Sequence, residues 1–168
     1  EAEIQLILQS YELLSTKHIP DDYKINNRKT RLDILAGLLD SDGYYSSKDK
    51  CFEITQKSKR LSDDILYLVR SLGYTGYQVE VEKSCSYKEE KRVGIYHKVI
   101  ISGNNLDEIP TKCPRKQAVP SNLVKNPLVT GITISPIGYG DYYGFTLDEN
   151  HRYLLGDFSV THNTTLVK

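Results

Sequence analysis

The sequence predicts an α+β protein in which an α-β-β-α-β-β-α unit with an antiparallel sheet is followed by an all-β segment. Three observations lead to this prediction. Apolar residues recur at helical spacing in three segments, short strands follow one another in local pairs, and the periodic pattern ends near residue 120. Locally joined strands pair in antiparallel fashion, so the sheet should be antiparallel.

The first two helices are predicted on either side of Pro20. Apolar residues at helical spacing indicate a helix over 1–16, and Pro20 blocks its continuation. A second helix should run from about Arg28 to Asp42, because leucines form one stripe along it. Gly43 is a natural stop for that helix.

Two short strands and a third helix come next. The strands are expected near 44–47 and 51–56, with a polar turn between them. The helix should span roughly 63–71, with Ser62 as its N-cap and Gly73 as the residue just beyond its end.

A second strand pair completes the predicted sheet. Alternation predicts strands near 77–81 and 93–101, across a charged loop at 86–91, and a short helix is expected over 104–109. If the apolar residues Tyr77, Val79 and Val81 pack inward, Glu80 and Glu82 face outward.

Composition places the chain among globular, intracellular proteins. It has 168 residues, 39% of them hydrophobic, which excludes disorder throughout. No run of roughly 20 apolar residues exists, so no helix should span a membrane. The three cysteines are odd in number and scattered, which is typical of reduced thiols.

The net charge of zero hides local excesses of positive charge. Residues 109–140 contain no acid, and 17–31 contain more bases than acids. Such segments could follow a phosphate backbone, or they could be ordinary solvated surface.

The stretch Leu35-Ala36-Gly37-Leu38-Leu39-Asp40-Ser41-Asp42-Gly43 is the most informative part of the first 120 residues. Ala36 and Gly37 lack bulk, so another helix can approach closely. Asp40 and Asp42 lie at the negative end of the helix dipole, where carboxylates are disfavoured unless a cation offsets them. The pair therefore indicates a metal site, preferably for Mg²⁺, with an ordinary Asp-Gly turn as the alternative.

This stretch closely resembles the signature of LAGLIDADG homing endonucleases, and the predicted order of elements matches one repeat of that fold. The resemblance implies a saddle-shaped antiparallel sheet that grips double-stranded DNA, with Asp42 holding the divalent metal and Asp40 acting in helix capping or local bonding. Lys17-His18-Ile19-Pro20 resembles the basic block between the two repeats of the family.

The same resemblance assigns further roles in phosphodiester hydrolysis and DNA binding. Lysines near the metals balance developing negative charge, and Lys17 and Lys116 are the candidates. The expected DNA contacts are Lys57, Lys59, Tyr96, Lys98 and Arg115.

The chain departs from the family pattern because only one signature is present. Residues 1–16 look like the end of a preceding repeat, so the chain is either the C-terminal part of a longer or split protein or pairs with a second copy. A DNA-binding module that does not cut, or a decayed relic, are alternatives. Outward carboxylates at Glu80 and Glu82 would repel phosphates but could accept from cytosine amino groups.

The tail carries a second resemblance. Residues 144–154 (GFTLDENHRYL) and 160–164 (VTHNT) closely resemble the two C-terminal splicing blocks of inteins. The side-chain amide of Asn163 can close a succinimide on its own carbonyl and release Thr164, whose hydroxyl would first accept the upstream segment. His162 is placed to polarise this carbonyl, and His151 can assist.

The resemblance to inteins implies a missing partner and a downstream host. The first splicing nucleophile and the early Thr-x-x-His block are absent, and Gly144 replaces an aspartate found in many inteins. The expected parts are therefore an endonuclease portion (1–120), a C-terminal splicing segment of the Hint type (121–163) and the start of the downstream extein (164–168). The run TTLVK resembles the residues that come after Gly-Lys in a P-loop, which suggests a P-loop NTPase host in the cytoplasm or nucleus.

Overall fold

The chain forms two compact units, Glu1–Leu128 and Val129–Lys168. The computed structural model describes residues 2–87, 90–120, 126, 129, 131–141 and 143–162. The first unit contains a four-stranded sheet and the second a two-stranded sheet, and all strand pairs in both are antiparallel. The predicted α+β class and antiparallel pairing are confirmed.

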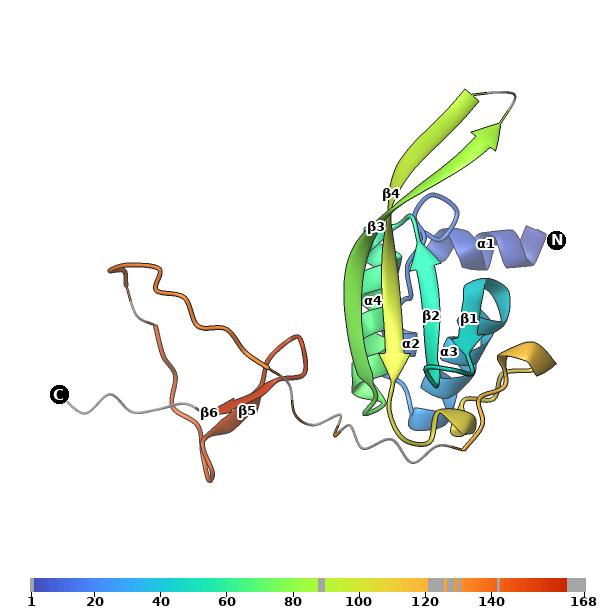
Figure 1. Ribbon diagram of the computed structural model, residues 1–168. Coiled ribbons are helices and arrows are strands. Elements are labelled where there is room, and N and C mark those ends of the chain that lie inside the picture. The colour runs from blue at the N-terminus through green and yellow to red at the C-terminus, as the bar shows by residue number, and fades with distance from the viewer. Residues whose placement is uncertain are drawn as a thin grey trace. The chain divides into compact units, whose positions relative to one another are not determined.

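The first unit follows the predicted order of elements (Figure 1). The main elements are helix α3 (Arg28–Asp42), strands β1 (Gly43–Ser46) and β2 (Cys51–Gln56), helix α4 (Lys59–Ser71), strands β3 (Thr75–Tyr87) and β4 (Glu90–Ser102), and the 3-10 turn η1 (Leu106–Glu108). Helices α1 (Ala2–Ser10) and α2 (Asp21–Lys24) precede them, and the 3-10 turn η2 (Pro114–Lys116) follows. The strands lie in the order β1-β2-β4-β3.

Helices α3 and α4 cover one face of this sheet, and the core lies between the two layers. The strand register pairs Phe52 with Ile101 and Ile54 with Val99, so these side chains share the covered face. They pack with apolar residues from both helices. The fully buried apolar side chains among the described residues are Leu35, Leu39, Phe52, Ile54, Ile65, Leu68, Val69, Val99 and Ile101. The other face exposes Tyr44 and Tyr77 among the described residues, and is called the open face below.

Strand β3 presents the opposite face from the one predicted. Tyr77 and Val79 are 48% and 37% exposed, so the expectation that they pack inward is wrong. The reason lies at Gly76, where an added Cβ would come within 2.8 Å of the Val69 side chain of α4. Only glycine fits this inward position, and strand alternation then directs Tyr77 and Val79 to the open face.

Helix α1 differs from its predicted bounds at its C-terminal end, and helix α4 at its N-terminal end. Helix α1 ends at Ser10 because Glu12 has a left-handed backbone with φ of 57°. Helix α4 begins at Lys59, four residues earlier than predicted, because Ser58 is the N-cap and its side chain accepts from the Leu61 amide. The predicted cap, Ser62, is instead fully buried within α4.

The two glycines predicted to end helices do so in different ways. Gly73 has φ of 87°, and the amides of Gly73 and Tyr74 bond back to Arg70 and Val69 in a Schellman motif, as predicted. Gly43 has an extended backbone, so it is not a left-handed cap. An added Cβ there would lie 2.7 Å from the Leu39 carbonyl oxygen, so glycine is needed for close passage from α3 into β1.

The remaining differences concern the ends of strands and the last helix. Strand β3 extends to Tyr87 and β4 begins at Glu90, so most of the predicted loop at 86–91 is strand. The β3–β4 hairpin extends beyond α4 (Figure 1). The helix predicted over 104–109 is only the short turn η1.

The second unit has little regular structure in its described residues. Strands β5 (Arg152–Leu154) and β6 (Val160–His162) form its sheet. Phe145 lies outside these strands and packs edge-on against Tyr153, with ring centroids 4.9 Å apart. Among the described residues of the whole chain, no helix is long and apolar enough to cross a bilayer.

Candidate functional site

Asp42, the predicted metal ligand, ends α3 with an exposed side chain, directly before Gly43, the first residue of β1. Its Oδ2 accepts a hydrogen bond of 2.9 Å from the side-chain amide of Gln56, the last residue of β2. Gln56 is 7% exposed and shares the covered face with Ile54 and Phe52. Gln56 was not among the predicted site residues. The sequence did carry a signal for it, because Gln56 follows Phe52 and Ile54 at every second position, and a polar side chain on a buried face needs a hydrogen-bond partner.

Asp40 has a different role from Asp42. Its two carboxylate oxygens accept hydrogen bonds from the backbone amides of Lys112 and Cys113, at 2.8 and 3.0 Å. These backbone hydrogen bonds hold the pKa of Asp40 below its usual value. Asp40 therefore fastens the segment that follows the sheet to the end of α3, in line with the local bonding expected for it.

Lys116 lies at the same end of α3. Its ammonium group donates to the backbone carbonyls of Leu39, Asp40 and Ser41 at 3.0, 2.8 and 3.2 Å. The residue is only 6% exposed. A lysine ammonium has three hydrogens, and three acceptors surround this one. The cation that should offset carboxylates at a negative helix end is thus supplied by the chain itself.

Lys17, the other predicted catalytic lysine, lies in the linker between α1 and α2 with an exposed side chain. Its carbonyl accepts a hydrogen bond of 3.2 Å from the Ser58 hydroxyl. Two residues later, the Ile19 amide donates a hydrogen bond of 2.9 Å to the Asp64 carboxylate. Lys24 also binds Asp64, at 2.7 Å. Burial acts to lower the pKa of Lys24, but its bonds to Asp64 and Asp21 outweigh this and raise it. The backbone carrying Lys17 is thereby fixed to α4.

The predicted DNA contacts do not gather in one place. Lys98 and Tyr96 lie on the open face, where Lys98 pairs with Glu53 at 3.2 Å. Lys57 is exposed and directly follows Gln56. Lys59 lies instead in the first turn of α4, on the helix layer, and Arg115 lies in η2 with an exposed side chain.

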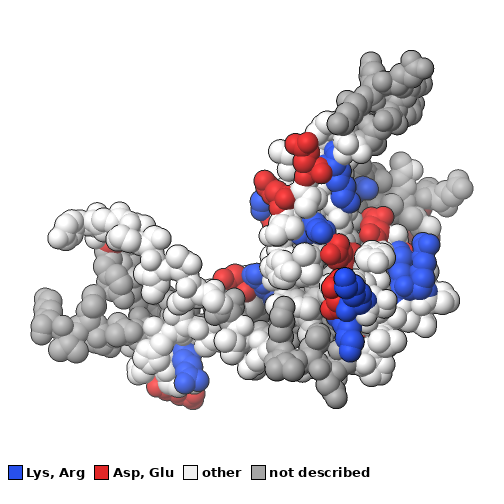
Figure 2. Space-filling model, viewed as in Figure 1, with Lys and Arg blue, Asp and Glu red and all other residues white. Residues whose placement is uncertain are grey.

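The open face of the sheet is aromatic and of mixed charge. Beside the Lys98–Glu53 pair, it exposes Tyr44 and Tyr77. On the side in view, Figure 2 shows basic side chains interspersed with acidic and uncharged ones across the first unit. Glu80 is directed to the covered side of β3, since it pairs with the buried His97. The expected repulsion between an outward Glu80 and phosphates on the open face therefore does not arise.

Part of the basic excess in 17–31 is used inside the fold. Arg28 donates to the Leu72 carbonyl at 2.8 Å and forms an ion pair with Glu108. Arg31 donates to the Ser71 carbonyl and hydroxyl at 2.8 and 2.7 Å. Both guanidinium groups thus satisfy carbonyls at the C-terminal end of α4, where positive charge is favoured.

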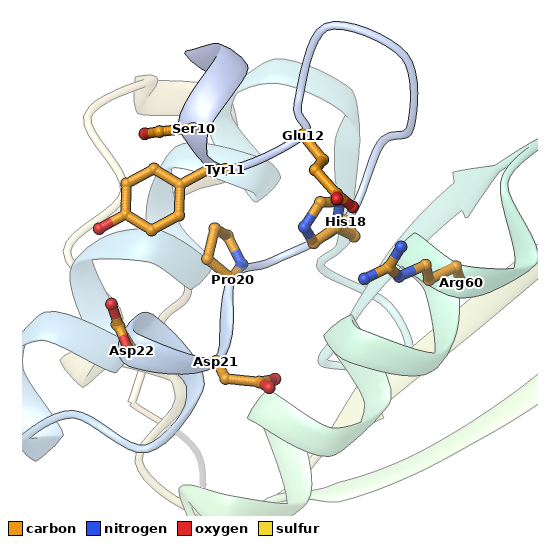
Figure 3. Close-up of a pocket in the computed structure, with 8 residues that line it drawn as sticks. All are labelled: Ser10, Tyr11, Glu12, His18, Pro20, Asp21, Asp22 and Arg60. Carbon is orange, nitrogen blue, oxygen red and sulfur yellow. The ribbon is translucent and has the colours of Figure 1, made fainter. Parts of the chain in front are cut away.

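A pocket of about 260 Å³ opens beside the linker, between the turn after α1 and the first turn of α4 (Figure 3). Figure 3 shows Arg60 pointing from α4 toward His18 and Glu12. The pocket is lined by three carboxylates, a histidine and an arginine among its eight residues, which are Ser10, Tyr11, Glu12, His18, Pro20, Asp21, Asp22 and Arg60. Neither Asp42 nor Gln56 lines it, so it is separate from the site at the end of α3.

The donor set around Asp42 suits Mg²⁺ in one particular binding mode. Among the residues that the structure describes, no three His, Cys, Asp or Glu side chains cluster as metal ligands. Mg²⁺, however, is often held by one or two carboxylates together with substrate phosphates and waters, without a full protein cage. The exposed Asp42 carboxylate meets that requirement, while the described residues form no fully enclosed site.

Two of the predicted splicing residues lie together in the second unit. His151 directly precedes β5, and the strand register places His162 opposite Arg152. The imidazole centroids of His151 and His162 are 5.8 Å apart in an edge-on arrangement. Asn163 and Thr164 lie outside the described residues.

Comparison with known proteins places the first unit in a family. A family model described as homing endonuclease matches residues 18–125. The replicative DNA helicase DnaB of Mycobacterium intracellulare is 38% identical over 72 residues, which are 42% of this chain but only 12% of that relative. The family match covers most of the chain, including Asp42, Gln56 and the whole four-stranded sheet. The chain therefore belongs to the homing endonuclease family.

Proposed function

We propose that the first unit is a LAGLIDADG-type endonuclease repeat that cleaves double-stranded DNA, and that Asp42 is its metal ligand. The observation that carries this proposal is the position of Asp42. Its exposed carboxylate ends the helix that bears the small-residue motif, directly before β1, and accepts a hydrogen bond from Gln56 at the end of β2.

In this proposal, the open face binds the DNA and Asp42 presents oxygen to the metal. Tyr44, Tyr77 and Tyr96 would contact the duplex, and Lys98 and Glu53 would contact base edges. Gln56 orients the Asp42 carboxylate, and Lys17 lies on a fixed backbone from which it would neutralise a phosphate. When bound, Mg²⁺ would polarise the scissile phosphate and activate water.

We propose that a second carboxylate comes from outside this repeat, because the described residues contain no cluster of three His, Cys, Asp or Glu side chains that could hold a metal ion. Gly37 supports this view, because it is exposed on α3 and an added Cβ would meet nothing within 4 Å. We propose that a second repeat packs there, whether from another part of a longer protein or from a second copy.

The nuclease proposal is tested by Mg²⁺-dependent cleavage of a DNA library with randomised sites. Wild type, Asp42→Ala and Asp107→Ala are compared, with Ca²⁺ used to measure binding in the absence of cleavage. Asp107 is an exposed carboxylate in η1 and serves as the control. We expect cleavage by wild type and Asp107→Ala, and binding without cleavage by Asp42→Ala. Tight binding by wild type without any cleavage would instead support the alternative, a DNA-binding module.

We further propose that the second unit is the C-terminal splicing segment of an intein. The Asn163 amide nitrogen would attack its own carbonyl carbon, the bond to the Thr164 nitrogen would break, and the leaving amine would take up a proton. The closeness of His151 and His162 supports this proposal, because neutral and protonated imidazoles can donate and accept protons near neutral pH.

The splicing proposal is tested by mixing the chain with an N-terminal intein portion and following the masses of the products. Wild type should release the segment that begins with Thr164, and Asn163→Ala should keep it attached. His162→Ala should slow release. Asn104→Ala, which changes an exposed residue of the other unit, should match wild type. Equal release from wild type and Asn163→Ala would exclude succinimide formation.

The proposed partners are a DNA target, the N-terminal portion and a host protein. The relative that matches part of this chain is named as a replicative DNA helicase, and a helicase host is compatible with the P-loop-like run TTLVK. We propose that the protein acts inside the cell, where both its DNA target and its host would be found.

A further inference from the structure

Lys116 joins the loop after the sheet to the end of the helix that carries Asp42. Its ammonium donates to the carbonyls of Leu39, Asp40 and Ser41, which are the three residues immediately before Asp42. These carbonyls belong to the last turn of α3, where backbone acceptors generally lack partners within the helix, although the Gly43 amide also donates to the Leu39 carbonyl. Lys116 therefore binds the backbone directly before Asp42, where the orientation of the Asp42 side chain depends on the end of α3.

The contact is buried and is reinforced from both sides. Lys116 is 6% exposed, and its own carbonyl accepts from the buried Thr111 hydroxyl at 3.0 Å. In the opposite direction, the Asp40 carboxylate accepts from the amides of Lys112 and Cys113. The cation of the loop thus binds the helix, and the carboxylate of the helix binds the loop.

All three ammonium hydrogens of Lys116 have backbone acceptors in this arrangement, so none is left for a DNA phosphate. The charge lies where the helix dipole and two carboxylates concentrate negative potential. Removing it would take this donor from the Asp40 and Ser41 carbonyls, would leave the Leu39 carbonyl with the Gly43 amide as its donor, and would increase the repulsion between Asp40 and Asp42.

We propose that Lys116 is a positioning residue, which holds the end of α3 so that Asp42 stays in hydrogen-bonding reach of Gln56. Lys116 then acts on catalysis through α3, without contacting the scissile phosphate. This inference rests on the proposed role of Asp42, but the geometry that it describes can be tested without any cleavage.

The primary test follows the side-chain amide resonances of Gln56 by ¹⁵N NMR on the full chain. Asp42→Ala defines where these resonances lie when the bond is absent. In Lys116→Met they should move at least half of the way to that position. Lys112→Met removes the same charge from an exposed side chain of the same loop while leaving its backbone amide in place, and it should keep the wild-type resonances.

A folded Lys116→Met variant with unchanged Gln56 resonances would overturn the proposal. If Lys116→Met does not fold, Lys116→Gln decides in the same way, since glutamine is polar but lacks the charge, one of the three donors and part of the reach of lysine. Movement of the resonances in Lys116→Gln supports the proposal, and wild-type resonances in that variant contradict it.

A second readout separates positioning from direct catalysis in the nuclease assay. Because loss of a residue that orients a metal ligand typically costs about 10-fold to 100-fold in metal affinity or activity, the Mg²⁺ concentration for half-maximal cleavage should rise at least about 10-fold in Lys116→Met. DNA affinity in Ca²⁺ should stay the same. A slower rate with an unchanged Mg²⁺ requirement would indicate phosphate contact and contradict the proposal. If wild type cuts no DNA, the proposed nuclease function fails, while the Gln56 resonances still decide on Lys116.

Discussion

At the scale of single residues, several charged side chains of this chain serve the ends of its helices. Lys116 donates to the last carbonyls of α3, and Arg28 and Arg31 donate to those of α4. Each cation meets the negative end of a helix dipole and supplies donors to backbone groups that have none within the helix. A basic residue in a sequence therefore need not indicate a DNA contact, even in a DNA-binding family.

Asp40 gives this arrangement a pH dependence. Its pKa is lowered by the amides of Lys112 and Cys113, so it binds a proton less readily in the folded state than in the unfolded state. Its contribution to stability is complete above the ordinary aspartate pKa of about 3.9 and is lost as the pH falls through the lowered value.

We therefore predict that Asp40→Asn reduces the acid sensitivity of the first unit. The urea midpoint of wild type should fall more between neutral pH and pH about 2 than that of Asp40→Asn, because only wild type has this carboxylate to protonate. Asp107→Asn is the matched control. Equal acid sensitivity in Asp40→Asn and wild type would show that the two amide bonds do not stabilise the ionised form.

The candidate site was only partly predictable at this scale. Asp42 could be identified because a short motif placed it at a helix end, and the structure puts it there. Gln56 could not be linked to Asp42, because the contact joins residues 14 positions apart and depends on how β2 lies beside α3. The three carbonyls bound by Lys116 are 75 to 77 positions away from it in the sequence. The sequence alone does not reveal whether a lysine ammonium group contacts water or backbone.

At the scale of elements, helix α3 and strand β2 were predicted within their observed bounds because local signals agree there. Helix α4 shows where local signals compete. Both Ser58 and Ser62 are residues favoured as N-caps, and the sequence pattern alone favoured Ser62. In the structure, Ser58 is the N-cap. Its hydroxyl accepts from the Leu61 amide and donates to the Lys17 carbonyl, and this tertiary contact helps to fix the start of α4.

We predict opposite effects of alanine at these two serines. Ser58→Ala should lower the free energy of unfolding by about 1 kcal/mol, because an N-cap is lost. Ser62→Ala should leave it nearly unchanged or raise it, because the fully buried Ser62 hydroxyl has no hydrogen-bond partner among the described residues. Urea unfolding of the two variants measures both effects. A larger loss in Ser62→Ala than in Ser58→Ala would restore Ser62 as the cap.

Strand β3 illustrates a different limit of prediction. Alternation showed correctly that two sets of residues face opposite sides, but apolar character suggested the wrong side for Tyr77 and Val79. The close approach of α4 at Gly76 decided the direction, and such an approach is invisible in the strand's own sequence. Apolar and aromatic residues on the open face are what a surface for a partner would carry.

At the scale of the whole molecule, Gly37→Ala should have opposite effects on the stability of this chain and on the proposed cleavage of DNA. Alanine is favoured over glycine by about 1 kcal/mol within a helix, and the space around Gly37 is open. Gly37→Ala should therefore raise the free energy of unfolding of this chain by about that amount.

The same substitution should impair cleavage if a second repeat packs against α3 at Gly37, because the added methyl group would separate the two helices. We expect slower Mg²⁺-dependent cleavage by Gly37→Ala together with its higher stability. A stabilised variant that cleaves as fast as wild type would show that no helix packs closely at this position.

The described apolar side chains of the second unit are largely exposed to solvent. Ile132, Ile134, Ile137 and Tyr143 are between 79% and 99% exposed, whereas the core residues of the first unit are close to zero. Contiguous exposed apolar surface is typical of a site that a partner covers. If the second unit is the C-terminal segment of an intein, the N-terminal portion should bury these side chains when the two are mixed. Hydrogen exchange of peptides from 131–162 should then slow, while peptides from β2 and β4, which already lie in a closed core, should exchange as before. Unchanged exchange in 131–162 after mixing with an N-terminal portion known to splice with other C-terminal segments would contradict the splicing proposal.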